Sequence, residues 1–135
     1  MLTNVIQGGS FMQELLQISE AELEVMKVLW LLGEASSSQI VESLSEVKEW
    51  KPKTVQTLIT RLVSKGAIKA ENTNIKAFIY KPLIGEMEYK SQANDSFLKK
   101  LYNGSVNLML ASFVKEQKLT KADIEELKKI LDEEK

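Results

Sequence analysis

The sequence predicts a mainly α-helical protein with one small β-hairpin, built in two parts. Three observations predict this class. Six segments carry apolar residues at the spacing of an amphipathic helix. Residues 75–81 alternate in the manner of a strand and follow a turn-forming Asn-Thr-Asn. At three helix starts, Ser or Thr is followed three residues later by Glu, Gln or Asp, which is the spacing of a capping box.

The first helix is predicted to begin after Ser19, with Glu22 completing its capping box and with Ile18 and Leu23 placed as a hydrophobic staple. It runs to about residue 32, because Gly33 is a typical helix stop. The preceding residues, 1–17, contain two adjacent glycines and no basic residue, so we expect a flexible tail rather than a secretory signal.

Two more helices follow. Ser36 and Gln39 repeat the capping-box spacing at the start of a second helix of about three turns. Pro52 suits the first position of a third helix, which runs to about residue 65 and ends at Gly66 as a left-handed cap. The apolar residues of this third helix are Val55, Leu58, Ile59 and Leu62.

A β-hairpin is predicted next, with strands over 67–71 and 75–81 and a tip at Asn72–Asn74. Phe78 and one of its two following residues, Ile79 or Tyr80, are expected to face the core. Three helices followed by a hairpin is the order of a winged helix-turn-helix. We therefore predict that architecture for residues 18–82.

Residues 83–135 are predicted to form three more helices, over 86–102, over 106–116 and after the N-cap Thr120. These helices have too little material to bury their own apolar surface, so we expect a C-terminal helical dimerisation domain. The residues expected at the interface of this homodimer are Leu101, Val106, Leu110, Phe113, Val114, Leu119, Ile124, Leu127, Ile130 and Leu131.

The composition favours a binding protein over an enzyme. The 135 residues include no Cys and no His, which excludes disulfides, thiolate metal sites and the usual catalytic triads. The chain also lacks a Gly-rich phosphate loop, so we predict no enzymatic activity, no cofactor and no metal. No stretch is long and apolar enough to span a bilayer, and we expect a cytoplasmic protein.

Charge is distributed unevenly along the chain. The net charge is −1, but residues 48–81 hold eight basic and two acidic residues, a local charge of +6. Residues 19–47 hold six acidic residues and one basic residue, a local charge of −5. A local concentration of basic side chains is typical of a nucleic-acid-binding surface.

The third helix carries a polar face that suits the major groove. Short hydroxyl side chains lie opposite its apolar face, with Gln56 and Arg61 beside them. Gln pairs with adenine, Arg with guanine, and Thr contacts the thymine methyl group. The residues predicted to contact double-stranded DNA are Lys51, Lys53, Thr54, Gln56, Thr57, Thr60, Arg61, Ser64, Lys65, Lys76 and Tyr80. Two alternatives stay open, an ordinary solvated helix face and a winged-helix adaptor that binds protein without specific DNA.

Several segments closely resemble the penicillinase repressor family. The matching segments include Trp50–Leu62, in which Pro52–Leu62 is the specific block, and Ile18–Met26 with Trp30. Further matching segments are Phe113-Val114, Leu119-Thr120 and Ile124–Leu127. The resemblance covers about residues 18–135.

That resemblance implies a homodimeric repressor of β-lactamase or related resistance genes, bound to a palindromic operator and removed when a membrane sensor-protease signals antibiotic. Induction in the family proceeds by cleavage between Asn and Phe in the dimerisation domain. The matching pair here is Ser112-Phe113, with Ser in place of Asn. Family members carry Arg at the position of Gln56, which implies a difference in operator preference.

Overall fold

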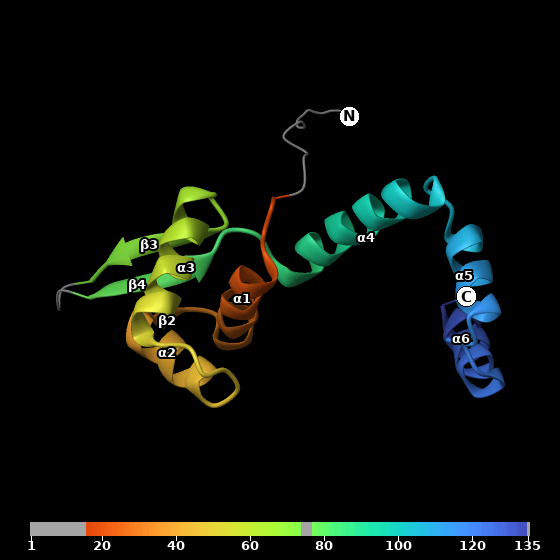
Figure 1. Ribbon diagram of the computed structural model, residues 1–135, viewed down its shortest axis with the longest axis horizontal. Helices are drawn as coiled ribbons and strands as arrows, with labels where there is room; N and C mark the ends of the chain where they lie inside the picture. The colour runs from red at the N-terminus through yellow and green to blue at the C-terminus, as the bar shows by residue number, and fades with distance from the viewer. Residues whose placement is uncertain (1–15, 74–76, 135) are drawn as a thin grey trace. The chain divides into compact units, whose positions relative to one another are not determined.

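The computed structural model describes residues 16–73 and 77–134, which form two compact units that divide between Gln92 and Ala93. Figure 1 shows the order of the elements along the chain. The elements are α1 (Glu20–Leu32), β2 (Ala35–Ser36), α2 (Ser37–Ser45), α3 (Pro52–Ser64), β3 (Ile68–Asn72), β4 (Phe78–Pro82), α4 (Glu86–Tyr102), α5 (Val106–Lys115) and α6 (Lys121–Glu133).

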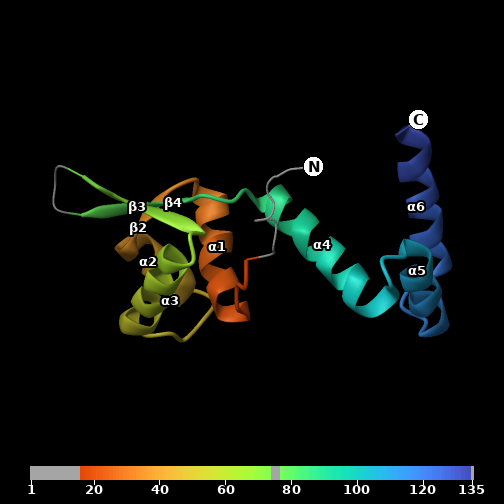
Figure 2. The same ribbon diagram turned by 90° about the horizontal axis from the view of Figure 1, so that it is seen from above.

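The first unit is a winged helix, as the sequence predicts. An antiparallel sheet of order β2-β4-β3 lies against α1, α2 and α3, and the β3–β4 hairpin extends beyond the helices as the wing (Figure 2). Its core draws on every one of these elements. The most fully buried apolar side chains are Val25, Met26, Leu29, Ile40, Val55, Ile59, Leu62, Ala67 and Ile68.

The helix ends follow the predicted capping chemistry. The Ser19 hydroxyl accepts a hydrogen bond from Glu22 N–H at 3.1 Å, and the Glu22 carboxylate accepts one from Ser19 N–H at 2.9 Å. Complete capping boxes also start α2 and α6. At the end of α3, Gly66 has a φ of 80°. Its N–H and that of Ala67 donate to carbonyls of the last turn, which confirms the predicted left-handed cap.

The sheet differs from the prediction at two places. Strand β2 has two residues, which pair with β4 through Ala35 opposite Tyr80, and two residues are too few to show an alternating pattern. Strand β3 also extends into the predicted tip, Asn72–Asn74. Asn72 is the last residue of β3 and pairs with Phe78, while residue 74 lies outside the described residues.

Strand β4 buries Tyr80, one of the two residues expected in the core beside Phe78, but it leaves Phe78 exposed. Tyr80 is buried in the core, with 7% of its surface exposed, because it pairs with Ala70 on the side of the sheet that faces the helices. Phe78 is 50% exposed although alternation places it on the same side as Tyr80. It lies two residues nearer the wing tip, outside the core cluster.

The first turns of α4 belong to the first unit. Trp30 Nε1 donates a hydrogen bond to the Ile84 carbonyl oxygen at 2.9 Å, and the Trp30 ring lies 5.8 Å from that of Tyr89. The structural boundary therefore falls at Gln92, within α4, whereas the sequence places it at residue 82. Trp30 and Tyr89 are far apart in sequence, so no local sequence pattern predicts their contact.

Leu16 and Gln17 are the described part of the predicted tail, and they are attached to the first unit. Leu16 packs against the core, and Gln17 offers its carbonyl oxygen to Lys65. The rest of that predicted flexible tail, residues 1–15, lies outside the described residues. Within residues 16–73 and 77–134, no helix combines the length and the apolar character needed to cross a membrane.

Candidate nucleic-acid interface

Helix α3 separates a buried face from a polar exposed face. Val55, Leu58, Ile59 and Leu62 are between 0% and 5% exposed. The polar side chains of α3 are exposed to solvent, and we call them the α3 strip. Its members are Lys53, Thr54, Gln56, Thr57, Thr60, Arg61 and Ser64, all exposed as the sequence predicts.

The threonines of the α3 strip are held in fixed orientations. Thr57 Oγ1 donates to the Lys53 carbonyl oxygen at 3.0 Å, and Thr60 Oγ1 donates to the Gln56 carbonyl oxygen at 2.9 Å. Because each hydroxyl hydrogen is used within the helix, what remains for a ligand is the methyl group and the oxygen lone pairs. A methyl group and an acceptor suit a thymine methyl and a base amino group.

Gln56 is linked to the preceding helix. Ser37 Oγ donates to Gln56 Oε1 at 2.9 Å, from the first residue of α2. This bond orients the amide of Gln56 and leaves both of its N–H groups for another acceptor. This connection between the two helices fixes the position of the Gln56 amide relative to α2.

The cations of the first unit fall into two groups. Lys69 and Lys81 pair with Glu71 at 3.2 and 2.8 Å, and Lys81 also lies 3.6 Å from Glu34. The positive charges of Lys69 and Lys81 are therefore partly neutralised. The cations at or near α3 that form no ion pair with any described residue are Lys51, Lys53 and Arg61. Among the described residues of α3 and the wing, the cations without an ion pair are thus those at α3.

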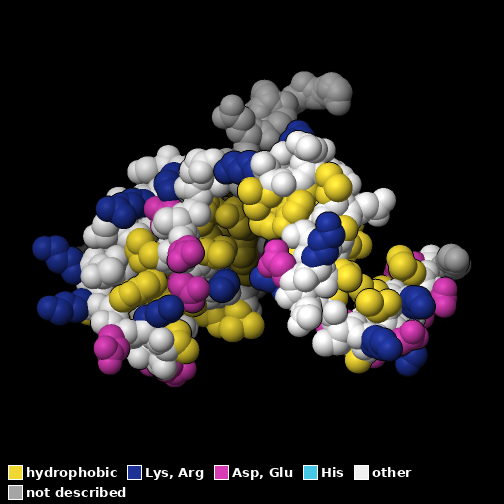
Figure 3. All heavy atoms as spheres, turned by 45° about the vertical axis from the view of Figure 1, so that its right-hand side comes forward, with side chains coloured by type: hydrophobic (Ala, Val, Ile, Leu, Met, Phe, Trp, Pro, Cys, Tyr) yellow, Lys and Arg dark blue, Asp and Glu magenta, His cyan; other side chains and the backbone are white. Residues whose placement is uncertain are grey.

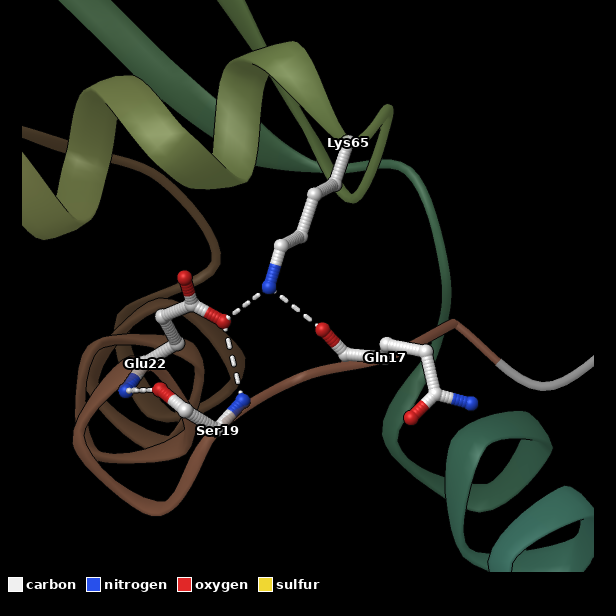
Figure 4. A network of polar contacts seen from close by, with 4 residues as sticks. All are labelled: Gln17, Ser19, Glu22 and Lys65. Carbon is white, nitrogen blue, oxygen red and sulfur yellow. Dashed lines mark hydrogen bonds and ion pairs between the residues drawn. The ribbon is translucent and has the colours of Figure 1, made fainter.

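The side chain of Lys65 points toward Glu22 and the Gln17 backbone (Figure 4). Its Nζ lies 2.5 Å from Glu22 Oε1 and also donates to the Gln17 carbonyl oxygen. The predicted role of Lys65 as a phosphate contact stays a prediction, and it competes with this ion pair, because a carboxylate of α1 already holds its ammonium. The sequence does not reveal this pair, whose members are 43 residues apart.

The predicted interface also includes two hairpin residues, Tyr80 and Lys76. Tyr80 is buried in the core, so its predicted role as a phosphate donor from the wing surface is wrong for this fold. Lys76 lies outside the described residues, and its predicted phosphate contact stays a prediction. Phe78, an exposed aromatic residue near the wing tip, was expected in the core instead.

The ion pair of Glu22 is expected to make stability depend on pH. Burial raises the pKa of the Glu22 carboxyl, but hydrogen bonds from Lys65 and Ser19 and the charge of Lys65 outweigh it, so the pKa lies below the usual 4.5. A carboxyl group with a lowered pKa stabilises the fold above its unfolded pKa, and this stabilisation is lost as the pH falls through the folded pKa. In urea denaturation, Glu22→Gln should lower the free energy of unfolding near pH ~7 and lower it less near pH ~3. An equal loss at both pH values would contradict this electrostatic role.

The second unit exposes much of its apolar surface. No residue of α5 or α6 is buried within one chain. Figure 3 shows apolar side chains on the surface over these helices, at the right of the view. The predicted interface residues with the largest exposure are Leu101 (63%), Leu131 (63%), Ile130 (52%), Val114 (50%), Val106 (49%) and Leu127 (41%). Leu110, Phe113, Leu119 and Ile124 are partly buried within the chain.

Ser112 and Phe113 lie inside α5. The Ser112 carbonyl oxygen accepts a hydrogen bond from Glu116 N–H at 3.0 Å, and the Ser112 hydroxyl donates to the Glu116 carboxylate at 3.3 Å. The side chains of Ser112 and Phe113 are partly buried. The pair that the resemblance marks for cleavage is thus held in regular helix.

Comparison with known proteins gives a consistent result. The family model described as penicillinase repressor matches residues 18–133. The penicillinase repressor of Bacillus licheniformis is 40% identical over 124 residues, which cover 92% of this chain and 96% of that protein. The methicillin resistance regulatory protein MecI of Staphylococcus aureus strain N315 is 41% identical over 115 residues, which cover 85% of this chain and 93% of that protein.

A solved structure matches the first part of the chain. It is the solution structure of the Bacillus licheniformis BlaI monomeric form in complex with the blaP half-operator. The TM-score is 0.50 at 41% sequence identity, and the match covers 56% of this chain and 92% of that chain.

Proposed function

Because this chain belongs to the penicillinase repressor family, we propose that it represses β-lactam-resistance or related genes by binding a palindromic operator as a homodimer. It does so in the cytoplasm, where it meets double-stranded DNA. Its relatives include a penicillinase repressor and a methicillin resistance regulatory protein, and the BlaI structure contains half of an operator. Release from the operator is proposed to follow a cut in the C-terminal helical unit.

The observation that carries the proposal is the α3 strip. It presents hydroxyl, amide and guanidinium groups on one exposed face of a helix whose opposite face is anchored in the core. Lys51 and Lys53 lie at the start of the helix, where they can reach phosphates beside the base contacts. The relative with the matching domain was solved in complex with half of an operator, which supports DNA binding by the first unit.

The test is a binding selection followed by a salt titration. The full chain would be used to enrich duplexes from a random-sequence pool, and the enriched duplex would be compared with a scrambled one by fluorescence anisotropy. We expect a strong preference for the enriched duplex and an affinity that falls steeply as KCl is raised, since each phosphate contact releases counterions. A protein-interaction adaptor would show neither property.

Arg61 is proposed to read a guanine. It lies on the α3 strip without an ion pair to any described residue. Arg61→Ala should weaken binding to the enriched duplex by about 1–3 kcal/mol and relax the sequence preference at one position. Lys53→Ala serves as the control, because loss of a phosphate contact weakens all duplexes alike. If Arg61→Ala also weakened all duplexes alike, the assignment to a base would be wrong.

The dimer proposal rests on the exposed apolar side chains of α4, α5 and α6. A single chain leaves Leu101, Leu131 and Ile130 more than half exposed. Burying these side chains against a second copy is favourable by roughly 25 cal/mol for each Å² removed from water. A two-fold dimer also matches the symmetry of a palindrome and doubles the number of base contacts.

The release proposal concerns the bond between Ser112 and Phe113. Cutting there separates Phe113 and α6 from the apolar residues earlier in α5. The two halves no longer form one interface, and the dimer dissociates. We propose a membrane sensor-protease as the enzyme that initiates this cut, by analogy with the family, and Ser112 as the residue on the amino side of the bond.

A further inference from the structure

The contact between Glu22 and Lys65 joins the start of α1 to the C-terminal end of α3. Lys65 is the first residue after α3, and Glu22 lies in the first turn of α1. Glu22 Oε1 accepts hydrogen bonds both from Lys65 Nζ, at 2.5 Å, and from Ser19 N–H, at 2.9 Å. One carboxylate oxygen therefore closes the cap of α1 and holds the end of α3 (Figure 4).

This contact is partly buried. The Glu22 side chain is 2% exposed and that of Lys65 is 33% exposed. A buried carboxylate without a partner would be strongly unfavourable, so the ammonium cannot leave it to meet a phosphate at low cost. The charge of Lys65 is therefore largely neutralised by Glu22.

The apolar contacts between α1 and α3 do not by themselves fix an orientation. Met26 and Leu29 of α1 share the core with Ile59 and Leu62 of α3, and apolar packing is favourable over a range of small rotations. Charge-assisted hydrogen bonds are short and directional. The Glu22–Lys65 pair fixes the C-terminal end of α3, while the bond from Ser37 to Gln56 acts nearer its start.

We propose that Glu22 and Lys65 are positioning residues for DNA binding, which set the orientation of the α3 strip without contacting DNA. The inference rests on the proposed function, because it explains how that surface is held for the major groove. Ser64, the last residue of the α3 strip, directly precedes Lys65, so a loose α3 end displaces the strip itself. Neither residue belongs to the surface that binds.

The experiment is a double-mutant cycle on the full chain, with the enriched duplex as the probe. Glu22→Gln keeps a side chain that suits a capping box and removes the charge. Lys65→Met keeps the length of the side chain and removes its charge. Affinity is measured over a series of KCl concentrations, per folded molecule, at a temperature where circular dichroism shows every variant folded.

We expect each single variant to weaken operator binding by roughly 2- to 30-fold. The double variant should be no weaker than the singles, because the two residues act through one contact. The dependence of affinity on salt should be unchanged in all three. Lys53→Met is the matched control for a phosphate contact, and it should lower the salt slope by about one. Glu20→Gln, in the same first turn of α1, controls for the loss of a negative charge.

Three outcomes would overturn the inference. If Lys65→Met lowers the salt slope while Glu22→Gln has no effect, Lys65 is a phosphate contact. If the variants lower only stability and bind normally once folded, the pair is merely structural. If the two effects add, the residues act independently. A wild-type chain that prefers no duplex would instead overturn the proposed function, and the two failures are therefore distinct.

Discussion

Replacing both Leu127 and Leu131 by glutamate is expected to dissociate the dimer and to weaken binding to a palindromic operator by roughly 10³-fold or more. The two side chains lie one turn apart on α6 and are 41% and 63% exposed in a single chain. A carboxylate in their place would have to be buried without a partner in the dimer, which is strongly unfavourable. A monomer contacts one half-site, and half the contacts give an affinity near the non-specific level.

Sedimentation velocity would measure the dissociation, and anisotropy on full and half operators would measure the affinity. Leu31→Glu is the matched control, since Leu31 is 84% exposed in the first unit and is not proposed to meet a partner. The control should remain dimeric and bind normally. A double variant that stays dimeric would show that α6 is not at the interface. A monomeric variant that keeps full affinity would show that dimerisation does not determine operator binding.

Leu62→Ala is expected to lower the free energy of unfolding by about 3–5 kcal/mol, because Leu→Ala changes in close-packed cores leave a cavity as well as losing apolar burial. Leu62 is completely buried between the helices and the sheet. Such a loss is a large part of the stability of a small domain, which is about 5–15 kcal/mol. Operator binding should be lost in proportion to the unfolded fraction.

Urea denaturation followed by circular dichroism would measure this loss. The matched control is Val63→Ala on the same helix, where the side chain is 37% exposed and the expected change is below about 1 kcal/mol. Similar losses for the two variants would mean that Leu62 is not the core residue that its burial indicates.

Local features of this fold could be predicted from the sequence. All three capping boxes depend on residues three positions apart, and each is present in the structure. The order of helices and hairpin follows from periodicity and from Gly and Pro at the helix ends. The exposed face of α3 was predictable too, because Val55, Leu58, Ile59 and Leu62 determine which side of that helix is buried.

Features that depend on distant residues could not be predicted. Lys65 looked like a phosphate contact because it follows a polar helix face, but its partner Glu22 is 43 residues away. Tyr80 was assigned to the wing surface because alternation in a hairpin does not say which of two neighbouring residues faces inward. The register of β4 against β2 and β3 decides that question, and it depends on pairs such as Ala35 with Tyr80.

The hydrogen bond on the Ser112 carbonyl has a kinetic consequence for the proposed cut. Glu116 N–H holds that carbonyl at 3.0 Å, so the bond that follows Ser112 is closed to a protease while α5 is intact. Cleavage requires α5 to open locally, and when opening and closing are fast, its rate follows the equilibrium population of the open form. The stability of one short helix then determines how long repression persists after the signal arrives.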